Sequence, residues 1–247
     1  MSFSGELVYF ARDSFGDLRV FDDGSQRTLA FGPGNEQSAV LKDNPAHPLF
    51  EYIQVMLLAL LYRQPRKVLC LGLGAGSLIS TLHAHCPQAE ITAVELRQAV
   101  IDIARKFFYL PESERIRLHC QDAGEFVAAD RECYDLIFSD LYTAHGLAPV
   151  QLQQDFLRQC SNRLNPAGLL VINCWHVHQG DGQMLRTLRG CFSEIRLCPT
   201  GDGNWVLFAG RLPLESRPEP LRERAISLSA LLGYSLLRHL KQLQNDI

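Results

Sequence analysis

The sequence predicts an α/β fold with a mostly parallel sheet that an antiparallel hairpin closes. From Arg66 onward, short apolar runs alternate with helix-compatible segments, and each pair has the length of a βα unit. The last two apolar runs, residues 194–199 and 204–209, are instead joined by Thr200-Gly201-Asp202-Gly203, which is typical of a hairpin turn. A glycine-rich turn follows the first apolar run after Arg66, and this turn marks where a ligand is expected.

Length and composition fit one large domain with small additions. The 247 residues are 47% hydrophobic and 21% charged, which is enough to bury a full core. A formal charge of -3 gives no reason to expect nucleic acid as a partner, because binding to a phosphate backbone needs clustered Lys and Arg. The longest apolar run, residues 55–62, is too short to span a membrane, and residues 1–13 show no secretory signal. We therefore expect a cytoplasmic protein.

The cysteines and histidines do not predict a disulfide framework or a metal site. The eight cysteines are scattered and form no C-x-x-C pair, which favours reduced thiols. His83 and His85 lie two apart in a predicted helix and so do not share a face. His176 and His178 could share a strand face, but no third ligand is evident. We expect no metal.

The N-terminal segment, residues 1–47, is predicted to form a small antiparallel β-ribbon and a polar link. Alternating apolar runs at 6–12, 17–21 and 27–31 are separated by turn residues that include Asp23-Gly24. The link follows at residues 32–44. Pro48 suits a first helical turn, and residues 49–61 are apolar on nearly all sides, which predicts a buried helix.

The core, residues 48–210, is predicted to contain five parallel strands before the hairpin. We expect strands near 68–72, 91–95, 116–120, 135–139 and 168–174. We expect helices near 76–85, 98–108, 123–129, 150–164 and 180–192. This order implies right-handed crossovers and helices on both faces of the sheet.

The C-terminal segment, residues 211–247, is predicted to be a linker followed by one helix. Residues 211–220 hold three prolines. The helix, about 221–243, places leucines on one stripe at positions 228, 232, 236, 240 and 243. The stripe is expected to pack on its own domain, with a homodimer contact as the alternative.

The spacing Gly72-x-Gly74-x-Gly76 after an apolar strand indicates a nucleotide-type ligand. Glycine allows a positive φ and a close approach of the ligand, while helix N–H groups face what is bound. A dinucleotide fingerprint would have a further glycine at position 77, where this chain has Ser77. The turn therefore does not favour a dinucleotide as the ligand. A tight turn without a ligand is the alternative.

Three carboxylates follow successive strands and are predicted to meet at the same sheet edge. Glu95 ends the second strand, where an acidic side chain can accept hydrogen bonds from both ribose hydroxyls. Asp122 and Asp140 lie just past the third and fourth strands. Either aspartate alone could be a helix cap. Ligands of open α/β sheets bind beyond the carboxyl ends of the strands, so the joint pattern predicts a site.

These motifs resemble the spermidine synthase (polyamine aminopropyltransferase) family, whose core is the Rossmann-like class I methyltransferase fold. The similarity covers about residues 6–210 and includes the N-terminal β-ribbon. The residues that carry it are Pro65 to Gly76, Ala93-Val94-Glu95-Leu96, Gln121-Asp122-Ala123, Tyr134 to Asp140 and Val171-Ile172-Asn173.

The resemblance implies a transferase with an S-adenosylmethionine-type donor, either S-adenosylmethionine or its decarboxylated form, and a small-molecule amine acceptor. The three glycines would form the nucleoside loop, Glu95 would hold the ribose, and Asp122 would accept from the adenine amino group. Asp140 would accept the proton of the attacking amine. We expect Tyr142 and His145, in the loop after Asp140, to line the acceptor pocket, with an ordinary loop as the alternative.

The chain departs from the family pattern at three positions. Ala75 stands where the glycine loop usually has an acidic residue, Thr143 where a second aspartate follows the catalytic one, and Arg97 where a further aspartate follows the ribose-binding glutamate. Fewer carboxylates weaken a pocket for a polycationic amine. Aminopropyl transfer to a small amine is therefore weighed against methyl transfer from S-adenosylmethionine and against a non-catalytic nucleoside-binding protein.

Overall fold

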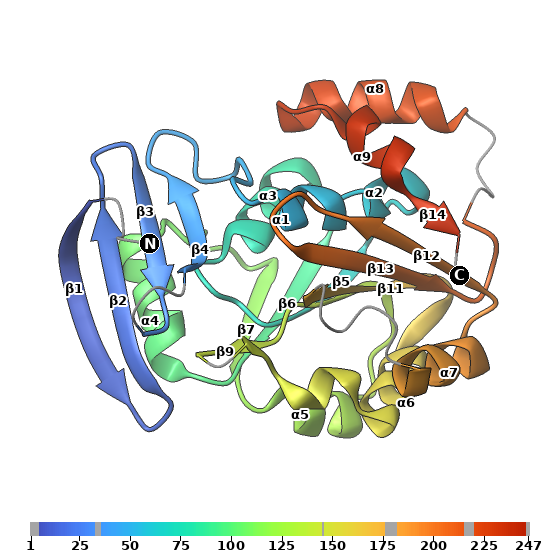
Figure 1. Ribbon diagram of the computed structural model, residues 1–247, viewed down its shortest axis with the longest axis horizontal. Helices are drawn as coiled ribbons and strands as arrows, with labels where there is room; N and C mark the ends of the chain where they lie inside the picture. Colours follow the sequence, from blue (N-terminus) through green and yellow to red (C-terminus); the bar gives the residue numbers. More distant parts are fainter. Residues whose placement is uncertain (1–4, 33–35, 145, 176–181, 215–219, 246–247) are drawn as a thin grey trace.

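The computed structural model describes residues 5–32, 36–144, 146–175, 182–214 and 220–245 (Figure 1). Its N-terminal part is an antiparallel sheet of β1 (Glu6–Asp13), β2 (Gly16–Asp22), β3 (Gln26–Ala30) and β4 (Glu36–Leu41), in that spatial order. This sheet packs on the core mainly through β2, β3 and β4, whose Leu18, Val20, Leu29 and Val40 are fully buried in the main core cluster. From β1, the Tyr9 ring lies 4.9 Å from that of Phe107 in the core. The predicted β-ribbon is thus confirmed.

The strand β4 was predicted as part of a polar link, and that prediction was wrong. Its sequence begins with polar residues, so it lacks the apolar alternation that indicates a strand. The segment forms a strand because it pairs with β3. In this pairing, Ser38 lies opposite Leu29 and is buried. The strand forms because a neighbouring edge satisfies its backbone groups.

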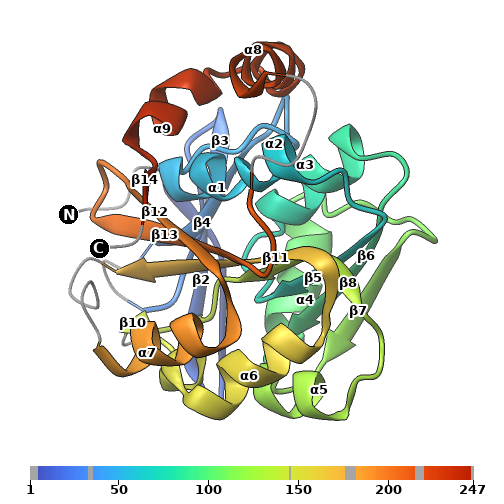
Figure 2. The same cartoon turned by 90° about the vertical axis from the view of Figure 1, so that its right-hand side faces the viewer.

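The core is one eight-stranded sheet in the order β14-β12-β13-β11-β8-β5-β6-β7 (Figure 2). Its parallel strands are β5 (Lys67–Leu71), β6 (Glu90–Glu95), β7 (Ile116–Cys120), β8 (Tyr134–Ser139) and β11 (Leu164–Trp175). The antiparallel end consists of β13 (Asn204–Gly210), β12 (Glu194–Pro199) and the short β14 (Gln244–Asn245). The predicted α/β fold, with its parallel strands and closing hairpin, is confirmed.

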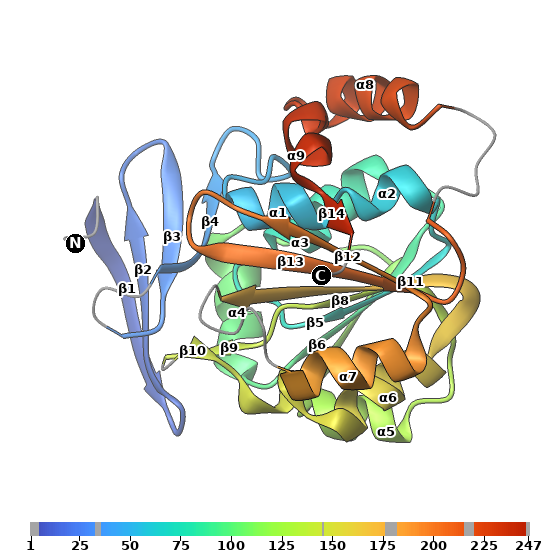
Figure 3. The same ribbon diagram turned by 45° about the vertical axis from the view of Figure 1, so that its right-hand side comes forward.

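Helices cover both faces of this sheet, as Figure 3 shows. One face packs against α1 (Glu51–Met56), α2 (Ala59–Tyr62), α3 (Ser77–His85) and α4 (Gln98–Phe107). The other face packs against α5 (Ala123–Ala129), α6 (Gln154–Asn162) and α7 (Gly182–Cys191). Alternate residues of β5 belong to different core clusters: Val68 and Cys70 to one, Leu69 and Leu71 to the other. This double burial explains why the strand is continuously apolar.

Two predicted helices and one predicted loop differ in detail. The helix expected at 49–61 is divided into α1 and α2 by a turn at Leu57 and Leu58. The helix expected at 150–164 begins as a short 3₁₀ helix, η1 (Pro149–Leu152), before α6. Before η1, a two-stranded hairpin of β9 (Tyr142–Thr143) and β10 (Gly146–Leu147) follows β8, where only a loop was expected.

The predicted C-terminal helix, 221–243, is two helices, α8 (Leu221–Leu232) and α9 (Leu236–Gln242). Gly233 ends α8 with φ of 79°, a left-handed conformation that suits glycine at a helix terminus. Leu232 and Leu236 are nevertheless buried in the core cluster around α1 and α2, with the other three leucines of the stripe packed partly against it. Packing of the stripe on its own domain is confirmed, and the homodimer stays a prediction.

The eight cysteines are free thiols, four of them buried. Within the described residues, no helix is long and apolar enough to cross a membrane. His83 and His85 lie on α3. The second predicted histidine pair, His176 and His178, falls outside the described residues.

Candidate active site

A cavity of about 590 Å³ opens at the carboxyl ends of β5, β6, β8 and β11. The site lies where the sheet order reverses direction, between β5 and β8, which is the place where open α/β sheets bind ligands. The N-terminal sheet, α1 and the β12–β13 hairpin complete its wall. The cavity is thus shared by segments that are far apart in the sequence.

The glycine turn takes the conformation that its sequence predicts. Gly72, Gly74 and Gly76 have φ of 96°, 55° and 82°. A Cβ on Gly72 would lie 2.3 Å from the backbone oxygen of Asp140, so the turn passes directly against the end of β8. Gly72 and Gly74 line the cavity. Gly76 instead caps the start of α3, with the Leu110 side chain where a Cβ would lie.

Glu95 holds the glycine turn from the end of β6. One oxygen of its carboxylate accepts a 3.1 Å hydrogen bond from the Leu73 N–H, and the other accepts a 3.0 Å bond from the Arg97 N–H. Burial raises the pKa of Glu95, and these two N–H groups oppose the rise. Because each carboxylate oxygen can accept two hydrogen bonds, both retain capacity toward the cavity that Glu95 lines.

Asp122 is both a helix cap and part of the cavity wall. Its Oδ1 accepts a 3.0 Å hydrogen bond from the Glu125 N–H at the start of α5. The same residue lines the cavity next to Ala123. The alternative of a helix cap is therefore confirmed, while contact with an adenine amino group stays a prediction.

Asp140 lies at the centre of the site, just beyond β8. Its Oδ1 accepts a 2.8 Å hydrogen bond from Asn173 Nδ2, and the Tyr52 hydroxyl donates to the same carboxylate. Burial raises the pKa of Asp140 to about 6, although both hydrogen bonds favour the ionised form. Asp140 thus combines an ionisable carboxylate with two neutral partners, at the junction of β8, β11 and α1.

Gln151 joins the strand ends behind Asp140 and was not predicted as a site residue. Its Oε1 accepts from the Ser139 hydroxyl at 2.6 Å and from the Leu141 N–H at 3.0 Å. Its Nε2 donates a 2.7 Å hydrogen bond to the backbone oxygen of Asn173. The side chain is fully buried, so these bonds fix the segments on either side of the catalytic candidate.

An aromatic pair lines the cavity beside Asn173. Tyr142 and Trp175 have ring centroids 5.7 Å apart, and the Tyr142 hydroxyl donates a 3.4 Å hydrogen bond to the Asn173 backbone oxygen. Gly146 leaves room for the Trp175 ring, because a Cβ there would lie 2.6 Å from it. Tyr142 therefore lines the cavity as predicted, whereas His145 falls outside the described residues.

The departures at positions 75, 97 and 143 have different surroundings. Arg97 is buried and donates to the Asp13 carboxylate at 2.8 Å and 3.0 Å, so it ties the N-terminal sheet to the core. Ala75 is fully buried in the core cluster. Thr143 lines the cavity and donates a 3.2 Å hydrogen bond to the Gly146 backbone oxygen.

Sequence reasoning missed Tyr52, Gln151 and Asn173 as site residues, for different reasons. Tyr52 sits in an apolar helix whose pattern indicates burial and gives no hint of a polar contact. Gln151 comes from a polar segment without any motif. For Asn173, a signal was present, since it belongs to the Val171-Ile172-Asn173 run of the predicted fifth strand, and this strand pairs with β8, which Asp140 follows.

The strand order, the glycine turn and the carboxylates at the switch point define a Rossmann-like transferase of the class I methyltransferase fold. Residues 51–205 match the family model described as the spermine/spermidine synthase domain. The chain therefore belongs to the spermine/spermidine synthase family. The predicted family and the prediction of a transferase are confirmed.

Three relatives illustrate this similarity. The chain is 28% identical to a polyamine aminopropyltransferase of Neisseria meningitidis over 95% of this chain and 91% of the relative. A probable spermidine synthase from Corynebacterium glutamicum has a similar structure, with a TM-score of 0.77, 19% identity and coverage of 100% and 91% of the two chains. The structure of human methyltransferase-like protein 13 in complex with SAH is also similar, with a TM-score of 0.65 and 27% identity. The similarity covers 74% of this chain and 93% of the human chain.

Proposed function

We propose that this chain transfers an aminopropyl group from decarboxylated S-adenosylmethionine to a small amine. The observation that carries the proposal is Asp140, whose carboxylate faces the cavity between the neutral partners Asn173 and Tyr52. A carboxylate in such surroundings attracts an ammonium group because neither partner neutralises its charge. The name of the Neisseria relative supports the same reaction.

The glycine end of the cavity suits the nucleoside part of the donor. Glu95 has spare acceptor capacity for ribose hydroxyls, and Gly72 and Gly74 expose backbone rather than side chains. Ser77 lines the same region, and its buried Oγ has no hydrogen-bond partner among the described residues. Buried polar atoms are normally satisfied, so Ser77 supports a polar ligand beside the turn.

The role of Asp140 follows from the chemistry of amines. An amine with a pKa near 10 is mostly protonated at neutral pH and cannot attack. Asp140 would hold the ammonium, take one proton and leave the nitrogen lone pair directed at the carbon beside the donor sulfur. A C–N bond forms while the C–S bond breaks, and the electrons of the broken bond convert the sulfonium into a neutral thioether. The proton then leaves Asp140 for water.

The surrounding residues would orient this carboxylate rather than react. Asn173 and Tyr52 donate to Asp140 and so limit its rotation. Gln151 holds the backbone on both sides of the same junction. Positioning of this kind lowers the barrier because the reacting atoms need less reorganisation.

Methyl transfer from S-adenosylmethionine is the second candidate. The observation that favours it is Thr143, which lines the cavity where the family pattern has an aspartate and so removes one negative charge from the acceptor side. The likeness to the human methyltransferase-like protein supports this alternative on the same scaffold.

Product analysis separates the candidates. The protein is incubated with S-adenosylmethionine or with its decarboxylated form and a panel of small amines, and the products are identified by mass spectrometry. Methylthioadenosine from the decarboxylated donor supports aminopropyl transfer. If S-adenosylhomocysteine is the only nucleoside product, the protein is a methyltransferase. If both donors bind in calorimetry without turnover, it is a non-catalytic nucleoside-binding protein.

A further inference from the structure

The β12–β13 hairpin carries a carboxylate into the acceptor side of the cavity. Asp202 and Asn204 line the same cavity as Asp140. Burial, the Asp140 charge and, to a smaller extent, the Asp202 charge raise the pKa of Tyr52 and of Tyr142. The hairpin carboxylate is therefore close enough to act electrostatically on the two phenols that flank Asp140.

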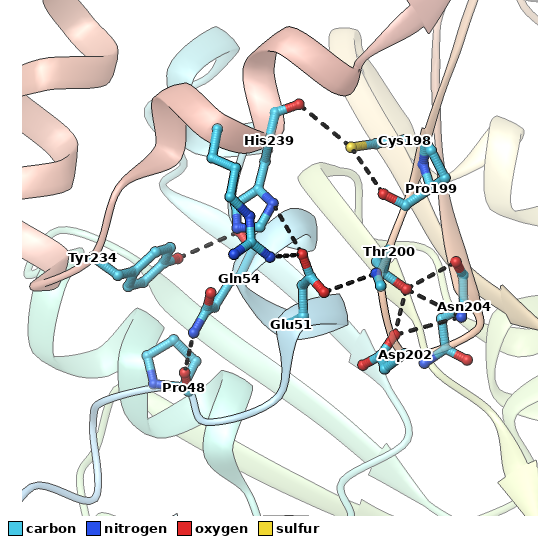
Figure 4. Close-up of polar contacts among 12 residues, drawn as sticks. Pro48, Glu51, Gln54, Cys198, Pro199, Thr200, Asp202, Asn204, Tyr234 and His239 are labelled. Carbon is cyan, nitrogen blue, oxygen red and sulfur yellow. Dashed lines mark hydrogen bonds and ion pairs between the residues drawn. The ribbon is translucent and has the colours of Figure 1, made fainter.

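The turn fixes the Asp202 side chain through one of its two oxygens. Its Oδ1 accepts from the Thr200 hydroxyl and, at 3.5 Å, from the Asn204 N–H (Figure 4). The described hydrogen bonds of Asp202 all use this oxygen, which leaves Oδ2 able to accept from a ligand.

A second contact holds the whole hairpin against α1. The Gly201 N–H donates a 2.8 Å hydrogen bond to Glu51 Oε2, and Arg238 of α9 pairs with the other oxygen of the same carboxylate. His239 Nδ1 lies 3.7 Å from that oxygen (Figure 4). Glu51 directly precedes Tyr52, which donates to Asp140. One turn of α1 thus fixes the hairpin with one residue and contacts Asp140 with the next.

The cavity also presents an unused acceptor beside Asp140. Asn173 is 1% exposed, and its Oδ1 has no hydrogen-bond partner among the described residues. The Nδ2 atom of the same side chain already donates to Asp140, so the free oxygen lies next to the carboxylate. A buried acceptor in this position is satisfied when a ligand with several N–H groups binds there.

We infer that Asp202 binds the distal ammonium group of a diamine acceptor whose reacting nitrogen lies at Asp140 and Asn173. The Tyr142 and Trp175 rings belong to the same wall, and aromatic faces tolerate both methylene groups and cations. Asp202 would thereby supply, from the β12–β13 hairpin, the negative charge that is missing at Thr143, where the family pattern has an aspartate. The inference rests on the proposed function, because it assigns the reacting nitrogen to Asp140.

Equilibrium binding of matched amines tests the role of Asp202 without requiring turnover. Binding of 1,4-diaminobutane and of 1-aminobutane is measured by calorimetry in the presence of methylthioadenosine. We expect the wild-type protein to bind the diamine at least about tenfold more tightly, a factor that corresponds to about 1.4 kcal/mol. Asp202→Asn should remove this preference and leave the affinity for 1-aminobutane unchanged, since the amide keeps the Oδ1 acceptor of the turn but lacks the charge.

Two further variants make the result specific. Asp202→Glu restores the charge and should recover part of the preference. Asp23→Asn is the matched control, because Asp23 lies in the β2–β3 turn and also uses Oδ1 to accept from neighbouring residues of its own turn. The inference is overturned if the wild-type protein shows no preference for the diamine or if Asp202→Asn retains it. Failure of the proposed function is seen separately, as absence of methylthioadenosine when the decarboxylated donor is supplied.

Discussion

Asn173 Nδ2 donates a 2.8 Å hydrogen bond to the Asp140 carboxylate and so joins β11 to the residue that follows β8, the neighbouring parallel strand. The register of β8 and β11 pairs Ser139 with Ile172, which brings the next residue of each strand together. The backbone of the sheet therefore determines where the carboxylate sits. Tyr52 adds a contact from a helix that precedes both strands.

Replacing Asp140 by Asn should abolish most of the turnover and leave donor binding nearly intact. The amide can still accept from Tyr52, but it cannot take a proton from an ammonium group. General-base catalysis contributes about 10²–10⁴-fold, so kcat should fall by about that factor. Steady-state kinetics and calorimetry with the donor measure the two effects. Unchanged kcat would remove Asp140 from the reaction.

The pH dependence of activity should report the pKa of Asp140. Burial raises this pKa from 3.8 to about 6, against the hydrogen bonds from Asn173 and Tyr52. Only the ionised carboxylate attracts an ammonium group, so kcat/KM should fall as the pH drops through about 6. A profile that stays flat to pH near 4.5 would mean that the carboxylate titrates normally.

The same pKa predicts how Asp140 affects stability. A carboxyl group whose pKa is higher in the folded state binds more protons there than in the unfolded state, so its contribution to stability is lost as the pH rises through about 6. Asp140→Asn should therefore raise Tm at pH 8, and the gain should disappear well below pH 4. Thermal unfolding at both pH values measures this difference. A loss of stability at pH 8 would show that the hydrogen bonds outweigh the burial of charge.

Gly72→Ala should destabilise the fold more than an equivalent change in open space. Gly72 has φ of 96°, and a Cβ would lie 2.3 Å from the Asp140 backbone oxygen. Gly24 has the same φ of 96° with nothing within 4 Å, so Gly24→Ala measures the backbone strain alone. In chemical unfolding, we expect the free energy of unfolding to fall by about 1–2 kcal/mol for Gly24→Ala and by more than about 3 kcal/mol for Gly72→Ala. Equal losses would contradict the close contact between β5 and β8.

Gln151→Leu should reduce both stability and turnover. The change leaves the Ser139 hydroxyl, the Leu141 N–H and the Asn173 oxygen without the partners that Gln151 provides. Each unsatisfied buried group costs about 1–3 kcal/mol, so the free energy of unfolding should fall by at least about 2 kcal/mol. The exposed Gln154→Leu is the control and should change little. If kcat falls no more in Gln151→Leu than in the control, Gln151 does not position Asp140.

The parts of the site that follow strand order could be predicted from the sequence, and those that depend on packing could not. Glu95 ends a recognisable strand, Asp122 and Asp140 follow two others, and parallel strands bring their carboxyl ends to one edge. Asp202 lies in a turn that was recognised only as a turn. The turn is held beside α1 by the hydrogen bond from the Gly201 N–H to Glu51, which lies 150 residues away in the sequence. No local pattern encodes such a contact.

The same distinction applies to the fold. Apolar runs predicted the parallel strands β5, β6, β8 and β11 correctly, because each run alone contains the signal of a strand that is buried on both faces. The strand β4 was missed because its first residues are polar, and pairing with β3, where Ser38 is buried, cannot be read from the segment itself. The break at Gly233 was missed because the leucine stripe continues across it with helical spacing, and both helices pack on the same cluster.

Glu51→Gln should weaken diamine binding without affecting the chemistry at Asp140. Glu51 accepts from the Gly201 N–H and pairs with Arg238, so it holds the hairpin through its charge and through a hydrogen bond. The amide retains an acceptor for Gly201 but loses the ion pair with α9, which should loosen the position of Asp202. We expect KM for 1,4-diaminobutane to rise about threefold to tenfold, with kcat and the KM for 1-aminobutane unchanged. Glu132→Gln, which removes the exposed ion pair with Lys67, is the matched control and should leave all three constants unchanged. An equal rise in KM for both amines would show that Glu51 supports the cavity in general and not the hairpin carboxylate.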